Sequence, residues 1–148
     1  MKKNYLIIVI ITLMACNPKN EISRENIDLK GIWQFATDTA NIGVQQHWYL
    51  SGLKDSVSLP GTTDEYKKGF LNTDTTTMHL NRLYKYEGAA WYRKKVVIPE
   101  SFRDKHIQLF LERTKYSQIW IDSSLVGGSR ILQSPQQFDV SGHLTPGE

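Results

Sequence analysis

The stretch AAWYRKKVVIP, residues 89–99, decides the fold class of this chain. Its aromatic and β-branched residues are those that favour β-strands. Pro99 ends the run, because proline has no backbone N–H to donate to a sheet. We therefore predict a long strand over residues 89–99.

Outward from this strand, apolar and polar residues alternate in further short runs. These runs lie at 31–35, 55–59, 107–112, 119–128 and 138–140, and Asp122-Ser123-Ser124 inside the fourth predicts the turn of a hairpin. No segment carries an apolar repeat of helical period over three turns, so the crossover helices of a parallel α/β fold have nowhere to lie. The pattern predicts an all-β sandwich.

Two segments between the expected strands lack this alternation. The first contains His47-Trp48-Tyr49 in a polar excursion, and the second, residues 62–82, is rich in Thr, Asp and Asn. We predict that residues 62–82 form a long loop, either functional or decorative.

The N-terminus is typical of an export signal. Lys2 and Lys3 precede the apolar run 5–13, which is shorter than the about 20 residues needed to span a bilayer. Leu13-Met14-Ala15-Cys16 then resembles the lipobox of bacterial lipoproteins. We predict a cleaved signal at 1–15, a flexible tether at 16–28 and one folded domain at 29–148.

Cys16 is the only cysteine of the chain, which excludes an intramolecular disulfide. The lipobox resemblance implies that Cys16 carries lipid and holds the protein in the cell envelope, at the outer membrane of a Gram-negative bacterium. The alternative is a chance free thiol at the end of an uncleaved anchor. Both interpretations predict attachment to a membrane.

The charge balance argues against nucleic acid as a partner. The formal charge is +3, but removal of Lys2 and Lys3 with the signal leaves 16 basic against 15 acidic residues. No basic stripe is present to neutralise phosphates.

A series of short motifs resembles, in order, the N-terminal sugar-binding jelly-roll domain of glycoside hydrolase family 2, which includes β-galactosidases and β-glucuronidases. The motifs are LKGIWQF (29–35), LPGT (59–62), YEGAAWYR (86–93), VIP (97–99), IWID (119–122), VG (126–127), FDV (138–140) and LTPG (144–147). Within them, the residues that carry the resemblance are Gly31, Trp33, Pro60, Gly61, Glu87, Gly88, Trp91, Tyr92, Arg93, Trp120 and Gly127.

The resemblance implies a galactose-binding-like jelly roll, and it implies that catalysis takes place on a different domain. The family keeps two catalytic glutamates in a (β/α)₈ barrel further along the polypeptide, so we expect no catalytic residue in this chain and no cofactor. The family pattern continues after Pro146-Gly147 into a last strand of the form Asn-x-Leu-x-Val-x-Val. We therefore expect the sandwich to lack its last strand, which leaves an open edge.

Three tryptophans of these motifs have two possible roles. Trp33, Trp91 and Trp120 fall on expected strands, where each ring can bury a large apolar area in the core. An exposed ring would instead stack on the face of a sugar. Gly88 is expected to adopt backbone angles closed to other residues where the chain enters its strand.

The sequence gives little indication of other catalytic or metal-binding sites. Glycoside hydrolysis with retention needs two carboxyl groups about 5 Å apart, whereas neighbours such as Asp64-Glu65 on an extended segment point to opposite sides. The histidines are widely separated and form no zinc-ligand spacing. They are His47, His79, His106 and His143.

Asp122 is a candidate for a position near carbohydrate. Some β-galactosidases of the family place the asparagine of an Asn-Gly turn from this domain at the edge of the active site, and Asp122 is the matching position. A carboxylate accepts hydrogen bonds from sugar hydroxyls and donates none. Turn formation is the competing role.

Three functions remain open. The first is the non-catalytic N-terminal part of a lipid-anchored family 2 glycosidase, β-galactosidase-like in its activity. The second is a free-standing carbohydrate-binding surface lipoprotein. The third is a structural or protein-binding lipoprotein of the outer membrane.

Overall fold

The computed structural model describes residues 24–76 and 78–147, and this part of the chain is all-β. Its strands are β1 (Gly31–Asp38), β2 (Asp55–Leu59), β3 (Phe70–Leu71), β4 (Tyr84–Lys85), β5 (Ala89–Arg93), β6 (Gln108–Leu111), β7 (Ser117–Ile121), β8 (Ser124–Ser129) and β9 (Gln136–Asp139). Three short 3₁₀ helices connect them: η1 (Trp48–Leu50), η2 (Glu100–Phe102) and η3 (Ser141–His143). The predicted fold class is confirmed, whereas the export signal and Cys16 lie outside the described residues.

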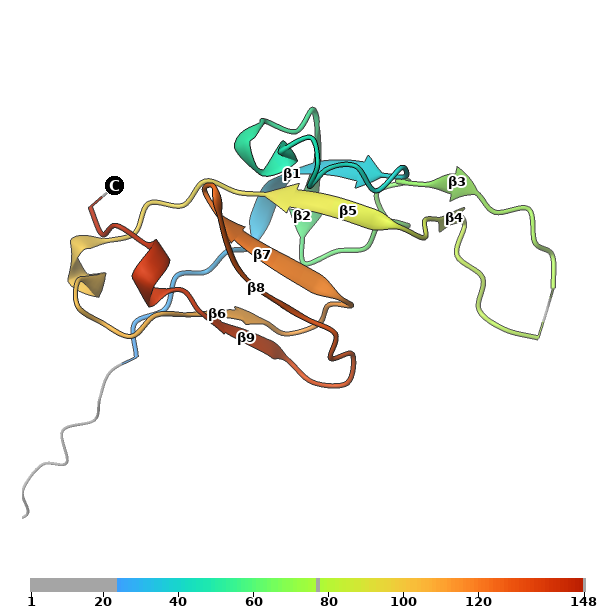
Figure 1. Ribbon diagram of the computed structural model, residues 1–148. Helices are drawn as coiled ribbons and strands as arrows, with labels where there is room; N and C mark the ends of the chain where they lie inside the picture. Colours follow the sequence, from blue (N-terminus) through green and yellow to red (C-terminus); the bar gives the residue numbers. More distant parts are fainter. Residues whose placement is uncertain (1–23, 77, 148) are drawn as a thin grey trace, which may run out of the picture.

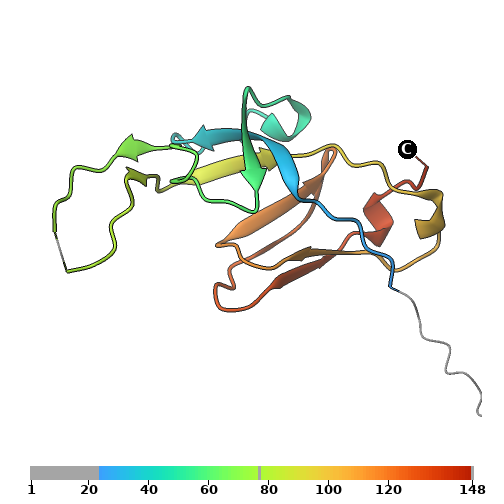
Figure 2. The same cartoon turned by 180° about the vertical axis from the view of Figure 1, so that it is seen from behind.

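One layer of the sandwich is the three-stranded sheet β2-β1-β5. All its pairings are antiparallel, with Trp33 opposite Val57 and Ala36 opposite Trp91. The central strand β1 therefore contacts β2 through its first half and β5 through its second half. Figure 1 shows this sheet above the other strands, and Figure 2 shows it from behind.

Two antiparallel pairs form the other layer. The β7–β8 hairpin turns at Asp122-Ser123 as predicted, and its register shifts between Ile119 and Trp120, where the ladder is irregular. The β6–β9 pair places Leu109 opposite Phe138, and β8 is a neighbour of β9. Alternation along β6 and β9 directs Leu109, Leu111 and Phe138 inward, which is how a half-buried antiparallel pair covers a core.

Two sequence predictions need correction. The strand expected over 89–99 ends at Arg93, because residues 94–98 have no partner strand within the described region to complete their hydrogen bonds. Inside the loop expected at 62–82, Phe70–Leu71 pairs with Tyr84–Lys85 as β3 and β4. Two residues per strand are too short to produce the alternation that sequence analysis relies on.

The core between the layers is small. The buried apolar side chains of the described region are Phe35, Val57, Ile98, Phe138 and Val140. Phe35, at the centre of β1, is the most deeply buried, and its ring meets the Tyr92 ring edge-on at 5.1 Å between centroids. Ile98 is buried although it lies outside any strand, and its carbonyl accepts a hydrogen bond from Gly147 N–H at 2.8 Å.

A clasp formed around Asp38 ends β1 and fixes the chain that follows. The buried Asp38 carboxylate accepts hydrogen bonds from Ile42 N–H at 2.9 Å, Gly43 N–H at 2.7 Å and the Trp91 indole N–H at 3.1 Å. Burial raises the pKa of this carboxyl, but the three donors outweigh burial and hold the pKa below its ordinary value. The clasp therefore joins the turn after β1 to the neighbouring strand β5.

Gly43 is the residue that lets the clasp close. A Cβ at this position would lie 2.3 Å from Trp91 Nε1 and 2.7 Å from the Asp38 carboxylate, so only glycine brings its backbone close enough to both.

A second buried polar group performs a similar role in the other layer. The Gln136 side chain at the start of β9 donates hydrogen bonds to the carbonyls of Lys115 at 2.8 Å and Ile131 at 2.7 Å, and it accepts one from the Ser117 hydroxyl. One buried amide thus ties β9 to β7 and to the loop that follows β8.

A stacked aromatic pair connects the two layers. The Tyr49 ring, carried by η1, lies parallel to the Trp120 ring of β7 at 4.1 Å between centroids. Figure 1 shows η1 close to the tip of the β7–β8 hairpin, where this contact forms. Tyr49 belongs to the segment that the Asp38 clasp fixes. Its stack on Trp120 therefore also positions β7 against that segment.

Substitution of Asp38 by asparagine tests the clasp. The folded state lowers the pKa of Asp38, so its contribution to stability is complete above the ordinary carboxyl pKa of about 4 and is lost as the pH falls through the lowered value. We expect Asp38→Asn to lower the free energy of unfolding by about 2 kcal/mol at neutral pH, and we expect the gap from wild type to narrow below pH about 4. Urea unfolding across this pH range measures both effects.

The matched control for that experiment is Asp28→Asn. Asp28 is an exposed carboxylate whose pKa is also lowered, by hydrogen bonds from Lys30, but solvent screens its interactions. We expect a much smaller change in stability. An equal loss in both variants, or an unchanged pH dependence in Asp38→Asn, contradicts the clasp.

Substitution of Tyr49 tests the contact between the layers. Tyr49→Ala removes the stacked ring and should lower the free energy of unfolding by about 1–3 kcal/mol, whereas Tyr49→Phe keeps the ring and should cost little. Near-ultraviolet circular dichroism should report a changed environment of Trp120 in the alanine variant alone. Equal behaviour of the two variants would show that the stack is unimportant.

Candidate functional site

The candidate site is a hollow beside the second half of β1, with a volume of about 720 Å³. Its walls are the end of β1, the segment leading through η1 into β2, and the turn that precedes β3. The lining residues are Phe35, Ala36, Thr37, Gln46, Trp48, Ser51, Gly52, Leu53, Lys54, Asp55, Lys67, Lys68 and Gly69. We call it the β1 hollow.

The wall that carries Trp48 is positioned by the Asp38 clasp. Beyond the clasp, Gln46 N–H donates to the Ile42 carbonyl at 2.8 Å and Trp48 N–H donates to the Gly43 carbonyl at 2.9 Å, which winds the chain into η1. The Trp48 ring then packs against Trp91 at 6.3 Å between centroids. Its indole N–H donates to the Gln46 side chain at 3.1 Å, so both residues present a defined polar and aromatic surface.

The opposite wall is a helical turn at residues 62–69. Thr62 and Glu65 form a reciprocal capping pair, in which Glu65 N–H donates to the Thr62 hydroxyl and Thr62 N–H donates to the Glu65 carboxylate. Lys67 has a left-handed backbone with φ of 55°, and the turn ends there. This places Lys67 and Lys68 side by side on the rim of the β1 hollow.

Three lysines and one carboxylate set the charge of the hollow. Lys68 Nζ lies 2.6 Å from the Asp55 carboxylate, and hydrogen bonds from Lys68 and from Ser56 N–H hold the pKa of Asp55 below its ordinary value. Asp55 is therefore ionised and is neutralised by Lys68. Lys54 and Lys67 form no ion pair with any other described residue, and they leave the hollow with an excess of positive charge.

The three tryptophans expected from sequence are half-buried and outside the hollow. Trp33 donates its indole N–H to the Leu29 carbonyl at 2.8 Å, and Trp91 donates to Asp38. Trp120 is covered by Tyr49, and its buried indole N–H has no partner among the described residues. Trp48, from the segment that sequence analysis treated as a polar excursion, is the tryptophan that lines the hollow.

Other residues of the family motifs hold loops and strands together. Arg93 donates to the Ser51 carbonyl, which fixes one end of the segment that borders the β1 hollow. Gly88 has φ of 147° where the chain enters β5, a backbone conformation that side chains rarely allow. Exposed Glu87 pairs with Lys85 at 3.1 Å.

The remaining motif residues lie at turns and at the core. Gly31 opens β1, and Pro60 follows Leu59 through a cis peptide bond at the end of β2. Gly61 lies against the Tyr66 ring, and Gly127 of β8 faces Phe138.

Asp122 lies at the first position of the β7–β8 turn, with φ of 50°. Aspartate tolerates this left-handed region better than most residues, so the geometry suits its role in the turn. Its proximity to carbohydrate stays a prediction.

The acidic pair weighed from sequence is used for folding. Asp64 accepts a hydrogen bond from Tyr84 N–H at 2.6 Å, and Glu65 belongs to the capping pair of its turn. His106 and His79 each face a single aspartate, at 3.6 Å and 4.0 Å respectively. Residues 24–76 and 78–147 contain no cluster of three side chains able to hold a metal ion.

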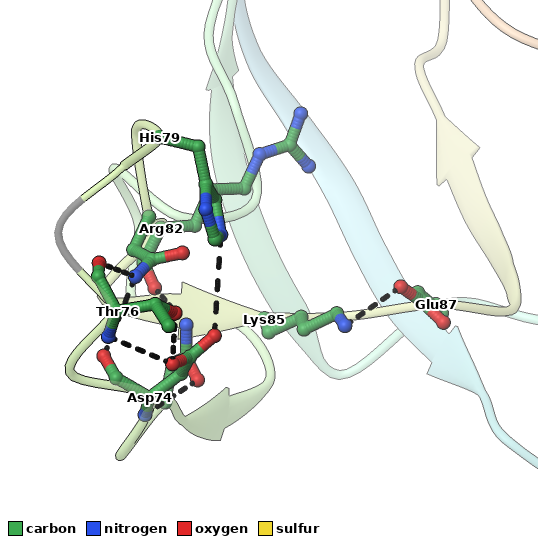
Figure 3. Close-up of polar contacts among 8 residues, drawn as sticks. Asp74, Thr76, His79, Arg82, Lys85 and Glu87 are labelled. Atoms are coloured by element: carbon green, nitrogen blue, oxygen red, sulfur yellow. Dashed lines mark hydrogen bonds and ion pairs between the residues drawn. The ribbon is translucent and has the colours of Figure 1, made fainter.

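The loop between β3 and β4 is organised by short polar side chains, as Figure 3 shows. Asp74 accepts hydrogen bonds from the backbone N–H and hydroxyl of Thr76, and these donors lower the pKa of Asp74. Asn72 binds the Arg82 carbonyl at 3.0 Å and Asn81 binds the Thr76 carbonyl at 3.1 Å. The abundance of Asp, Asn and Thr in this segment is therefore explained by the hydrogen bonds that these side chains make within the loop.

The arm formed by this loop with β3 and β4 carries an apolar surface. It projects from the side of the sheet in Figures 1 and 2. Its exposed apolar side chains are Phe70, Leu71, Met78, Leu80 and Leu83. No helix in the described part of the chain is long and apolar enough to cross a membrane.

Comparison with known proteins identifies the domain. The family described as "Glycosyl hydrolases family 2, sugar binding domain" matches residues 27–148. A β-glucuronidase of Paenibacillus borealis is 24% identical over 131 residues, which are 88% of this chain and 20% of that protein. A β-glucuronidase of Pongo abelii is 24% identical over 117 residues, 71% of this chain and 16% of that protein.

Solved structures show the same fold. A β-glucuronidase from Ruminococcus gnavus matches with a TM-score of 0.66 and 22% identity over 81% of this chain and 19% of that one. A β-glucuronidase from an uncultured Clostridium matches with a TM-score of 0.66 and 21% identity over 88% and 22%. The chain thus spans about a fifth of the length of these relatives, and the relatives are glucuronidases where the sequence had suggested galactosidase-like activity. The chain belongs to glycoside hydrolase family 2, as its sugar-binding domain.

Proposed function

We propose that this chain is the non-catalytic sugar-binding domain of a lipid-anchored family 2 glycosidase. The observation that carries the proposal is the match of the family's sugar-binding domain to residues 27–148. The domain supplies a surface that contacts carbohydrate, and bond cleavage takes place on a separate catalytic domain of the same enzyme. The adjacent acids Asp64 and Glu65 are instead engaged in the fold, since Asp64 accepts a hydrogen bond from Tyr84 N–H and Glu65 from Thr62 N–H.

Glucuronides are the first candidate substrates of the whole enzyme. The relatives found by sequence and by structure are named β-glucuronidases, and two Ruminococcus gnavus structures hold D-glucaro-δ-lactam and a C6-substituted uronic isofagomine. Galactosides, expected from the family resemblance alone, are the second candidate.

The exposed apolar arm supports a role inside a larger assembly. Phe70, Leu71 and Leu83 are largely exposed on β3, β4 and their loop, and Met78 and Leu80 are almost fully exposed. Several exposed apolar side chains on one projecting arm fit a contact with another protein surface. A further domain of the glycosidase is the partner that the family match favours.

The membrane anchor is proposed from the sequence of the N-terminus. Lys2 and Lys3, the apolar run 5–13 and the site Leu13-Met14-Ala15-Cys16 support cleavage before Cys16 and lipid attachment to its thiol. The polar stretch after Cys16 would hold the domain away from the lipid surface, in the cell envelope.

Metabolic labelling with palmitate tests the anchor. We expect the wild-type chain to incorporate label and to partition into the detergent phase of Triton X-114, and Cys16→Ala to do neither, because Cys16 is the only thiol of the chain. Labelling of the alanine variant, or recovery of unlabelled wild type in the aqueous phase, would exclude lipidation at this residue.

Recovery of the native enzyme tests the catalytic assignment. Antibody against this chain should recover β-glucuronidase activity from detergent extracts of the source bacterium. The 148-residue chain alone should hydrolyse neither 4-methylumbelliferyl β-D-glucuronide nor the corresponding β-D-galactoside. Activity recovered on the galactoside alone favours the second candidate substrate. Hydrolysis by the chain itself, or no glycosidase in the immune precipitate, overturns the proposal.

A further inference from the structure

The β1 hollow combines excess positive charge with an aromatic face, and this combination selects a ligand class. We infer that the β1 hollow binds an acidic sugar, a hexuronate unit, through Lys54 and Lys67 with Trp48 against the sugar ring. The inference deepens the proposed function and rests on it, because it names which carbohydrate this domain contacts.

The charges favour an anionic ligand over a neutral one. Of the three lysines in the lining, Lys68 is held by Asp55 at 2.6 Å, and its charge is compensated. Lys54 and Lys67 stand on two walls of the hollow and have no acidic partner among residues 24–76 and 78–147. An ammonium group donates hydrogen bonds and accepts none, so a carboxylate placed between the two lysines satisfies both.

The remaining lining groups suit a pyranose ring. Trp48 is half-buried, so one part of its ring is fixed against Trp91 while another part borders the hollow. Aromatic faces pack well against the C–H groups of a sugar. The Gln46 side chain, oriented by its hydrogen bond from Trp48, offers an amide that can both donate to and accept from hydroxyl groups.

The size of the hollow agrees with such a ligand. About 720 Å³ lies within the usual range for small-molecule sites, and it leaves space for one or two sugar rings. The lysines are on flexible stems at the rim, so we expect weak, salt-dependent binding rather than tight capture.

Ligand-observed NMR on the 148-residue chain tests the inference with two probes that differ only in charge. Methyl β-D-glucuronide carries the carboxylate, and methyl β-D-glucoside has a hydroxymethyl group in its place. We expect the glucuronide to bind about five- to tenfold more tightly, and we expect this preference to shrink when NaCl is raised from about 0.02 M to about 0.2 M. Equal affinities for the two probes overturn the inference.

A pair of matched variants locates the binding site. Lys54→Ala with Lys67→Ala should lower the affinity for the glucuronide about five- to tenfold and leave the affinity for the glucoside unchanged. Lys95→Ala with Lys115→Ala removes the same charge from exposed positions outside the hollow and should change either affinity less than about twofold. Equal losses in both variants overturn the inference, because they show a general effect of charge.

A competition experiment separates the sugar from its charge. Sodium acetate carries the carboxylate without the ring. We expect displacement of the glucuronide to need an acetate concentration about tenfold higher than that of the glucuronide. Displacement at equal concentrations reveals an anion site without sugar recognition and overturns the inference. Failure of these binding tests leaves recovery of glycosidase activity by the antibody unaffected, so the two proposals fail separately.

Discussion

The carboxylate of Asp38 is the group on which the arrangement of this domain depends. It ends the central strand β1, accepts two backbone N–H groups of the following turn and accepts the indole N–H of Trp91 from the neighbouring strand. Because the turn fixed in this way leads into η1, the clasp also positions Tyr49 against Trp120 and Trp48 against the β1 hollow. One buried charge therefore connects the sheet, the contact between layers and the candidate site.

The alternation of apolar residues was sufficient to predict the all-β class and the β7–β8 hairpin, because burial of one face imposes a period of two on each strand. The β-branched residues at 96–98 led to too long a prediction for β5, since residues 94–98 have no described partner strand, and hydrogen-bond pairing is not visible in a local pattern. The alternation missed β3 and β4, whose two-residue ladder is held by loop hydrogen bonds instead of by buried side chains.

The candidate site was less predictable than the fold. No local pattern in the sequence marks Asp38, because its role depends on a hydrogen bond from Trp91, 53 positions away. The adjacent aromatics Trp48 and Tyr49 were the one available signal, since two large rings in an otherwise polar segment indicate packing against something. The motif residues taken from the family resemblance lie at strands, turns and the core, whereas the lysines of the hollow belong to no such motif.

Hydrogen exchange at the indole N–H of Trp91 is the most direct measurement of the central claim. If the Asp38 clasp is closed, this proton exchanges far more slowly than an exposed indole, and its chemical shift follows a carboxyl group that titrates below the ordinary range of aspartate. If the proton exchanges at the rate of an exposed indole, or its shift is insensitive to acid pH, the clasp is absent and the account of how the sheet, layers and hollow are connected is wrong.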